Sequence, residues 1–356
     1  MARIQVKHPV NLSTPLIGAE VECCLYCKGK DIIRAGHRHN KRTTVQLWWC
    51  HDCARVFSPH PAKGKVWPLS IILEAVRLYY LGYTRAQVAE RVKEKTGLAL
   101  PERTLSWWLA ELRELTTYTY FRRELLSEFQ PKRAVRTQRL HHKQTYYYAT
   151  HYAKLWALLH EERNGAFFAL RDFLAEMNRA CPHGLFQGEH RASQDRASYD
   201  LTGTEIRASH NLACRVAGLV LQSVTDRRRR HDTLQRFMLA TDSVTVAVEV
   251  PIFLLPEDIS SLRTRHGPGI PLSTDDPLTG HVDFLQIRNG KIYILDYKPN
   301  AEKERPIAQL MTYALALSSR TGLDLFSFVC AWFDEEHYFE FYPRQVIRNA
   351  VTVSST

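Results

Sequence analysis

Two aspartates and a lysine near the C-terminal end of the chain are the residues whose types and spacing most directly indicate chemistry. Asp283 begins one alternating apolar run, and Asp296 and Lys298 form an Asp-x-Lys triplet at the end of the next. The two runs are separated by Asn289 and Gly290. Asn-Gly between alternating apolar residues is the strongest short-range signal of a β-hairpin with a two-residue type I′ turn. The register of such a hairpin places Asp283 directly opposite Asp296.

This register predicts that both carboxylates and the lysine lie on one face of the hairpin. Side chains alternate along a strand, so Asp283 shares its face with Asp296 and Lys298. Opposed residues have Cβ atoms roughly 4.5–5.5 Å apart, and like charges there destabilise a hairpin. We therefore expect a divalent cation between the acids, and carboxylate oxygens suit Mg²⁺ or Mn²⁺. Metal-bound hydroxide beside an ammonium group is sufficient to hydrolyse a phosphodiester. The alternative is an ordinary Asp–Lys salt bridge on a half-exposed hairpin.

A second group of residues with metal-binding chemistry lies near the N-terminus. Cys24 and Cys27 form one Cys-x2-Cys pair, Cys50 and Cys53 form a second, and 22 residues separate the two pairs. Four thiolates on two tight turns suit a tetrahedral zinc ion. The neighbouring Cys23 is either a spectator or a rival first ligand. A site with four protein ligands has no open position, so we expect this zinc to be structural.

Other uses of these cysteines fit less well. His37 and His39 are only two residues apart, which is too close for a finger with two cysteines and two histidines. Disulfides require an oxidising compartment that nothing else in the chain indicates. The strand pattern over residues 43–49 favours a β-ribbon between the cysteine pairs. The remaining Cys181, Cys214 and Cys330 are scattered, and we expect no additional metal cluster from them.

Three short helices are predicted after the cysteine pairs, over residues 68–81, 85–96 and 101–115. Thr84 is a good N-cap for the second helix, and Gly97 ends it. Such a trio, with a glycine turn before its last helix, is typical of a helix-turn-helix. The N-terminal outward residues of the last helix would then contact DNA bases; here they are Glu102, Arg103, Ser106 and Trp107. A helical domain that only packs or dimerises is the alternative.

The charge distribution favours a polyanion as partner of the N-terminal part. Of the chain's 356 residues, residues 1–143 contain 25 Lys and Arg against 12 Asp and Glu, a net charge of +13, and residues 144–356 have a net charge of −2. Nucleic acid is the usual partner of such a segment. Residues 120–148 add basic residues interleaved with aromatic ones, which either follow a phosphate backbone or form a solvated linker helix.

The composition excludes several classes of protein. Aromatic residues make up 11% of the chain and Gly and Pro are few, which excludes a disordered or collagen-like chain. Apolar stretches are shorter than the roughly 18–20 residues that a membrane helix needs, and no signal peptide is recognisable. We therefore expect no membrane partner and a cytoplasmic, nucleoid-associated location.

These motifs carry two resemblances to known families. The cysteine pairs and the three helices, residues 20–116, resemble the N-terminal DNA-binding region of insertion-sequence transposases. Asp283 followed by Asp296-x-Lys298 resembles the PD-(D/E)XK nuclease superfamily, and Gln309-x3-Tyr313 in the next helix resembles the Gln-x3-Tyr motif of its RecB-like branch. The second resemblance implies a restriction-endonuclease-like αβββαβ domain in which Asp283 and Asp296 bind catalytic Mg²⁺ or Mn²⁺.

The superfamily also has an upstream acid, for which the resemblance offers two candidates. Glu249 in the strand predicted over residues 244–255 is the first, and Glu205 is its rival. RecB-like members often have a histidine before this strand, and His210 fits that description. Gln309 and Tyr313 would share one face of their helix and support the substrate or the site. The chain has no cysteine cluster of the iron–sulfur type of this branch and no Gly-x4-Gly-Lys-Ser/Thr loop for ATP.

These expectations combine into a multidomain α+β protein. We expect a zinc ribbon at residues 18–60, a helix-turn-helix at 66–116, a basic helical connector at 117–200 and a nuclease domain at 201–347. The implied function is a metal-dependent deoxyribonuclease whose partner is DNA and which is compatible with a homodimer. The alternatives are a transposase or recombinase of a mobile element and a non-catalytic DNA-binding regulator.

Overall fold

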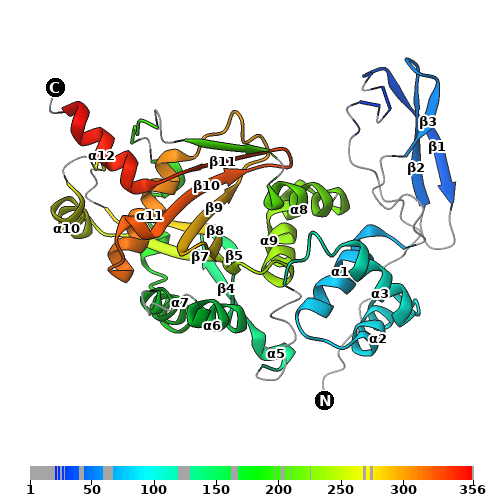
Figure 1. Cartoon of the computed structure of the whole chain (residues 1–356), viewed down its shortest axis with the longest axis horizontal. Helices are drawn as coiled ribbons and strands as arrows, with labels where there is room; N and C mark the ends of the chain where they lie inside the picture. Colours follow the sequence, from blue (N-terminus) through cyan, green and yellow to red (C-terminus); the bar gives the residue numbers. More distant parts are fainter. Residues whose placement is uncertain are drawn as a thin grey trace. The chain divides into compact units, whose positions relative to one another are not determined.

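The computed structural model describes residues 21–354 except 22, 25, 28, 40–43, 59–66, 119–128, 162–166, 196, 202–204, 210, 225, 268–269 and 273–275. It is a mixed α+β structure with two β-sheets (Figure 1). The chain divides into two compact units. The first comprises Met1–Glu114 and Leu219–Thr233, and the second comprises Leu115–Gly218 and Leu234–Thr356.

A three-stranded antiparallel sheet carries the second cysteine pair in the first unit. Its strands are β1 (Ile32–His39), β2 (Thr44–Cys50) and β3 (Arg55–Phe57). Ile32 pairs with Cys50, and Cys50 also pairs with Arg55, so the second cysteine pair lies at the turn between β2 and β3. The β-ribbon expected between the cysteine pairs is therefore present.

The three predicted helices are also present in the first unit. They are α1 (Leu69–Tyr80), α2 (Arg85–Thr96) and α3 (Glu102–Glu111). Thr84 caps α2 as expected, because its hydroxyl accepts a hydrogen bond from the N–H of Gln87 while the Gln87 side chain accepts one from the N–H of Thr84. Gly97 ends α2 with a φ of +71°, a conformation that favours glycine.

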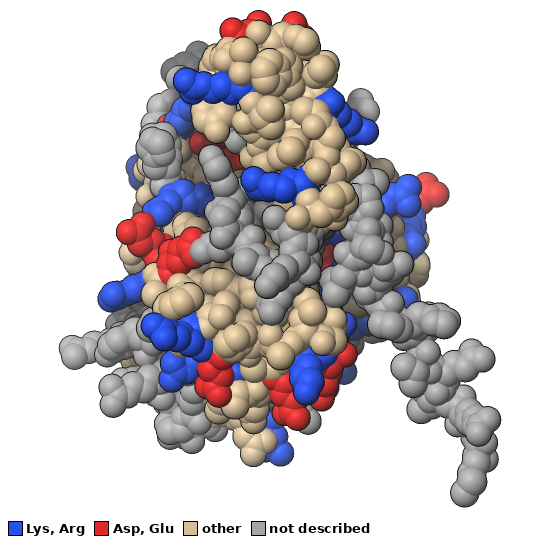
Figure 2. Space-filling view, turned by 90° about the vertical axis from the view of Figure 1, so that its right-hand side faces the viewer, with Lys and Arg blue, Asp and Glu red and all other residues tan. Residues whose placement is uncertain are grey.

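Charged side chains are mixed on the surface drawn in Figure 2. Lys and Arg side chains on this face are interspersed with uncharged residues and with groups of Asp and Glu side chains, rather than joined in a single stripe. On this face, the described Lys and Arg side chains are therefore scattered.

The second unit is built around an eight-stranded mixed sheet with strand order β4-β5-β7-β8-β9-β10-β11-β6. Only β9 and β10 pair in parallel among the strands of this sheet that the structure describes; the other pairs are antiparallel. The strands are β4 (Val135–His142), β5 (Gln144–His151), β6 (Ile206–Ser209), β7 (Thr245–Leu254), β8 (Leu278–Arg288), β9 (Lys291–Tyr297), β10 (Phe328–Phe333) and β11 (His337–Phe341).

Helices are interspersed with these strands along the chain. They are α5 (Pro131–Ala134), α6 (Tyr152–Glu161), α7 (Phe168–Ala180), α8 (Leu212–Val220), α9 (Arg230–Thr241), α10 (Pro256–His266), α11 (Ile307–Thr321) and α12 (Pro343–Ser354), of which α8 and α9 each have residues in both units. Along the C-terminal part the order is α9, β7, α10, β8, β9, α11, β10, β11. No described helix is long and apolar enough to cross a membrane.

The central hairpin is buried on both of its faces. Leu285, Ile287 and Ile294 are inaccessible to solvent and belong to the main apolar core, which also contains the buried side of α11. Phe284 points to the opposite face, where its ring lies 5.7 Å from the ring of Phe333. Most of the hairpin is therefore buried, whereas Asp283 and Lys298 at its end are half-buried.

A buried ammonium group joins α6 to the turn between α9 and β7. Lys154 is fully buried, and its Nζ donates to the backbone oxygens of Leu239 and Thr245 at 2.6 and 3.1 Å. It also lies 3.4 Å from Oδ1 of Asp242. Burial lowers the pKa of Lys154 to about 8, although Asp242 opposes this effect. These contacts satisfy the charge where β7 begins.

The main sheet includes strands from both sides of the boundary expected at residue 200. Residues 135–151 form an antiparallel hairpin, in which His142 pairs with Gln144, and β5 pairs with β7. A basic linker helix was one of the two predictions for residues 120–148. From residue 135 onwards these residues form strands instead. The physical reason is that β4 lies at the sheet edge, where basic side chains are common because they discourage further pairing.

Candidate functional site

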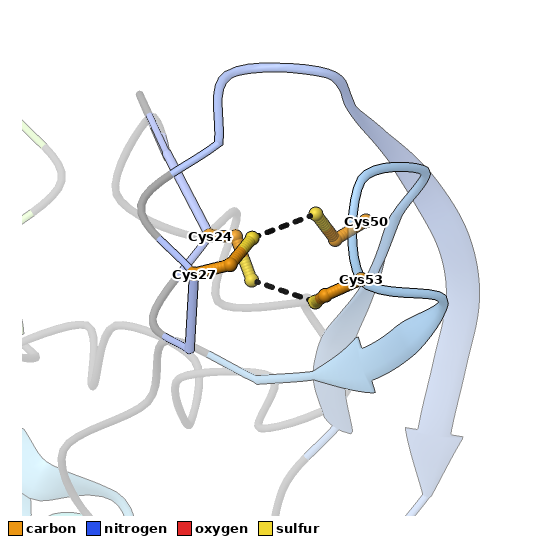
Figure 3. A group of neighbouring side chains, drawn as sticks. All are labelled: Cys24, Cys27, Cys50 and Cys53. Carbon is orange, nitrogen blue, oxygen red and sulfur yellow. Dashed lines mark hydrogen bonds between the residues drawn. The ribbon is translucent and has the colours of Figure 1, made fainter.

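The four cysteines of the two Cys-x2-Cys pairs form one cluster (Figure 3). Sγ of Cys24 is 3.7 Å from Sγ of Cys53, and Sγ of Cys27 is 3.6 Å from Sγ of Cys50. A tetrahedral zinc ion with ordinary Zn–S bonds separates its sulfur ligands by about 3.8 Å. The group is therefore compatible with a structural zinc ion, and the neighbouring Cys23 lies outside the group.

The β8–β9 hairpin has the register predicted from Asn289-Gly290. Both turn residues have positive φ values, +52° and +65°, as a type I′ turn requires. Arg288 pairs with Lys291, and the ladder continues without a shift to the pair of Phe284 and Leu295. Asp283 and Asp296 are the next residues along each strand, so the register sets them opposite each other.

Asp283, Asp296 and Lys298 lie together at this end of the hairpin. Nζ of Lys298 is 2.7 Å from Oδ2 of Asp296, a side chain that is almost fully buried. Oδ2 of Asp283 accepts a hydrogen bond from the N–H of Tyr297 at 3.0 Å. The structure thus brings two carboxyl groups and one ammonium group together, with Asp296 buried and Asp283 and Lys298 half-buried.

The electrostatics of this cluster disfavour two negative charges. Burial, followed by the charge of Glu249, raises the pKa of Asp283 from its usual 3.8 to about 7. Burial, followed by the charge of Asp283, raises the pKa of Asp296 to about 7 as well, although Lys298 opposes both shifts. One ammonium does not neutralise both carboxylates, so their charges favour binding of a proton or of another cation.

Glu249 joins this cluster from the neighbouring strand. Val248 pairs with Phe284 and Val250 pairs with Val282, so Glu249 lies opposite Asp283 across the β7–β8 ladder. Its φ of +50° is unusual for a residue other than glycine. Gln235 of α9 donates a hydrogen bond to Oε1 of Glu249 at 2.8 Å. The carboxylate is therefore held beside the acid pair.

The other residues considered for the upstream position are placed differently. Glu205 forms an ion pair with Arg305. His210 lies outside the residues that the structure describes. Of the two candidate acids, Glu249 is thus the one whose charge acts on Asp283.

Gln309 and Tyr313 project from one face of α11. Nε2 of Gln309 donates to the hydroxyl of Tyr313 at 2.8 Å, and the tyrosine is almost fully buried. Burial raises the pKa of Tyr313, and the charges of Asp296 and Asp283 raise it further. Gly280 of β8 allows this position, because a Cβ atom there would lie 2.6 Å from Cε1 of Tyr313. The charges of both aspartates therefore act on Tyr313, and Gln309 contacts its hydroxyl.

The residues predicted to contact DNA lie at the start of α3. The guanidinium of Arg103 lies 5.1 Å from the centre of the Trp107 ring, and Trp107 is 60% exposed. Ser106 donates to the backbone oxygen of Glu102 at 3.0 Å and accepts a hydrogen bond from Arg85 at 2.9 Å. A cation stacked on an exposed indole is a surface that can bind a phosphate or a base.

One cluster was not anticipated from the sequence. His142, Cys181 and His183 lie close enough to one another to hold a metal ion. The sequence indicated no additional metal cluster for Cys181, but β4 brings His142 to the turn after α7, where Cys181 and His183 lie. The close spacing of Cys181 and His183 was the local signal available. His281 of β8 also contacts His142, with 2.9 Å between ring nitrogens.

Comparison of the chain with models of protein families, with curated proteins and with solved structures finds no match.

Proposed function

We propose that the chain is a metal-dependent deoxyribonuclease whose N-terminal part binds DNA. The observation that carries this proposal is that three neighbouring strands, β7, β8 and β9, bring together four side chains: Glu249, Asp283, Asp296 and, directly after β9, Lys298. A buried and a half-buried aspartate, both with pKa values raised to about 7, lie beside a lysine, which matches the residue types of the PD-(D/E)XK site that the sequence resembles.

The element order of the second unit supports the same proposal. With α10 treated as an insertion, α9, β7, β8, β9, α11 and β10 follow the αβββαβ order that the resemblance implies. The parallel pairing of β9 with β10 across α11 is the expected geometry for a strand–helix–strand connection. The restriction-endonuclease-like fold is thus the architecture that we infer for this unit.

The residues of the site have distinct roles in this proposal. Asp283 and Asp296 hold Mg²⁺ or Mn²⁺, with Glu249 adding negative charge on the side of Asp283. Such a metal supplies Lewis-acid activation of water and of the scissile phosphate. Lys298 holds the attacking water or stabilises the negative charge that develops on the phosphate oxygens. Gln309 keeps the Tyr313 hydroxyl oriented towards the acids and the substrate backbone.

The first unit serves recognition in this proposal. Arg103, Ser106 and Trp107 contact DNA from the N-terminal end of α3, and the four cysteines hold a structural zinc ion in the adjacent ribbon. The net charge of +13 over residues 1–143 supports a polyanionic partner. DNA binding, the nucleoid location and the catalytic metal all belong to the proposal, and a homodimer is compatible with it.

Cleavage assays with the full chain test the proposal. We expect nicking or linearisation of supercoiled DNA, or digestion of linear or single-stranded DNA, that requires added Mg²⁺ or Mn²⁺. Asp296→Ala should abolish this activity while DNA binding persists. Equal cleavage by wild type and Asp296→Ala would overturn the assigned site. DNA binding without cleavage of any substrate, under any metal condition, would favour the non-catalytic regulator instead.

A further inference from the structure

Three potential metal ligands converge where the end of β4 meets the turn after α7. Nε2 of His142 is 2.8 Å from Nδ1 of His183 and 4.0 Å from Sγ of Cys181. All three ligand atoms lie within 4.8 Å of one another. A tetrahedral zinc ion with ordinary bond lengths separates nitrogen and sulfur ligands by about 3.3–3.6 Å. The observed distances bracket this range, so shifts of about half an ångström would place an ion at its usual bond lengths.

The second nitrogen of His142 has the partner that a metal-binding histidine needs. Nδ1 of His142 lies 2.9 Å from Nε2 of His281. Histidines that bind a metal through one nitrogen almost always donate a hydrogen bond through the other, which sets the tautomer and the ring orientation. When His281 accepts this bond, Nε2 of His142 carries no proton and faces His183 and Cys181.

The surrounding rings hold these histidines in place. His142 stacks on Phe186 with 4.1 Å between ring centres, and His281 stacks on Tyr146 with 3.7 Å between them. His142 is almost fully buried, whereas His183 is exposed. The group is therefore preorganised on its inner side and accessible from solvent on its outer side.

We propose that His142, Cys181 and His183 form a second metal site that takes Zn²⁺ or a similar borderline divalent ion. Two imidazole nitrogens and one thiolate are a donor set typical of zinc, and three protein ligands leave a fourth position for water on the exposed side. The ion ties the end of β4 to the turn after α7. His281 connects this site to β8 two residues before Asp283. The proposal stands on these ligands alone and does not require nuclease activity.

Metal content of the purified full chain tests this proposal. Inductively coupled plasma mass spectrometry after dialysis against metal-free buffer should give about two zinc equivalents per chain, one for the four cysteines and one for this group. His183→Asn should lose about one equivalent, and its exposed position makes it compatible with folding. Cys181→Ser should lose the same equivalent.

Two control variants and a second measurement make the result decisive. His190→Asn changes an exposed histidine seven residues after His183, and Cys214→Ser changes a buried cysteine outside the group, so both should keep the wild-type zinc content. With Co²⁺ in place of zinc, the wild-type spectrum minus that of His183→Asn should contain thiolate-to-cobalt charge-transfer absorption. If the wild type and every variant each contain one zinc equivalent, then His142, Cys181 and His183 hold no metal and their imidazoles are only hydrogen-bonded to one another. That result would overturn the proposal.

Discussion

Glu249 and Asp283 occupy facing positions on the adjacent strands β7 and β8. Two acids in facing positions of a ladder repel each other, and the charge of Glu249 adds to burial in raising the pKa of Asp283. Gln235 of α9 holds Glu249 in this place through a hydrogen bond to Oε1. The arrangement costs folding free energy and concentrates negative charge at one point, which is the property expected of a cation-binding site.

Removing the charge of Asp283 should stabilise the chain at high pH when no catalytic metal is present. Because the pKa is raised from 3.8 to about 7 in the folded state, the folded chain binds an extra proton between these values. Stability should therefore fall as the pH rises through about 7. Asp283→Asn keeps an oxygen that can accept a hydrogen bond from the Tyr297 N–H. We therefore expect its free energy of unfolding to exceed that of wild type by roughly 1–3 kcal/mol at pH 8. At pH 4 the two free energies should be about equal.

Thermal unfolding without added Mg²⁺ or Mn²⁺ measures this effect. Chelators should be left out, so that they do not remove metal from the four cysteines. Added Mn²⁺ should stabilise wild type at pH 8 and leave Asp283→Asn nearly unchanged. A stability difference between the two proteins that does not vary with pH would contradict the raised pKa.

Replacing Lys298 should separate metal binding from cleavage. Lys298→Met retains the length of the side chain and removes the ammonium that lies 2.7 Å from Asp296. We expect the rate of DNA cleavage at saturating Mn²⁺ to fall by roughly 10²–10³-fold, the size of effect seen when a donor that stabilises transition-state charge is removed. Stabilisation by Mn²⁺ should persist, since both carboxylates remain. Lys303→Met, at an exposed position, is the matched control and should cleave like wild type; similar rates for the two variants would count against a role for Lys298.

The four-cysteine group should hold zinc that the ribbon needs in order to fold. Cys50 is fully buried and pairs with both neighbouring strands. Cys50→Ser should release one zinc equivalent and increase proteolysis within residues 21–58, because a small domain of this kind depends on its metal. Cys23→Ser should retain the zinc, since Cys23 lies outside the group. The reverse pattern would identify Cys23 as a ligand.

Arg103 should contribute to DNA affinity through one phosphate or base contact. Arg103→Ala also removes the cation beside the exposed Trp107 ring. We expect weaker binding by about 1–3 kcal/mol and, if the contact is to a phosphate, a salt dependence reduced by about one unit of slope. Lys93→Ala removes the same charge from an exposed position of α2 and is the control. Fluorescence anisotropy at several salt concentrations measures both, and equal losses would indicate only a diffuse effect of net charge.

Local chemistry made parts of this structure predictable. Asn289 and Gly290 determine the turn, and the turn determines the register of every residue up to Asp283 and Asp296. The cap at Thr84 and the stop at Gly97 set the ends of α2 in the same way. In each case, residues within one turn of the chain supply the signal.

Long-range placement was the part that the sequence did not reveal. The strand β4 has weak alternation and many basic residues, because it lies at the sheet edge and only part of it is covered. His142 and Cys181 are 39 residues apart, and only the sheet order brings them together. A ligand set assembled from a strand end and a distant turn has no fixed spacing that could be recognised beforehand.

The left-handed backbone at Glu249 has a consequence for how this chain can change over generations. A non-glycine residue in such a conformation costs on the order of 1 kcal/mol or more, whereas glycine adopts it freely and asparagine tolerates it better. Folding alone would therefore favour glycine or asparagine at position 249. A descendant that no longer needed the carboxylate would gain stability by losing it. The identity of this one residue in related sequences should thus record whether selection still acts on the acid.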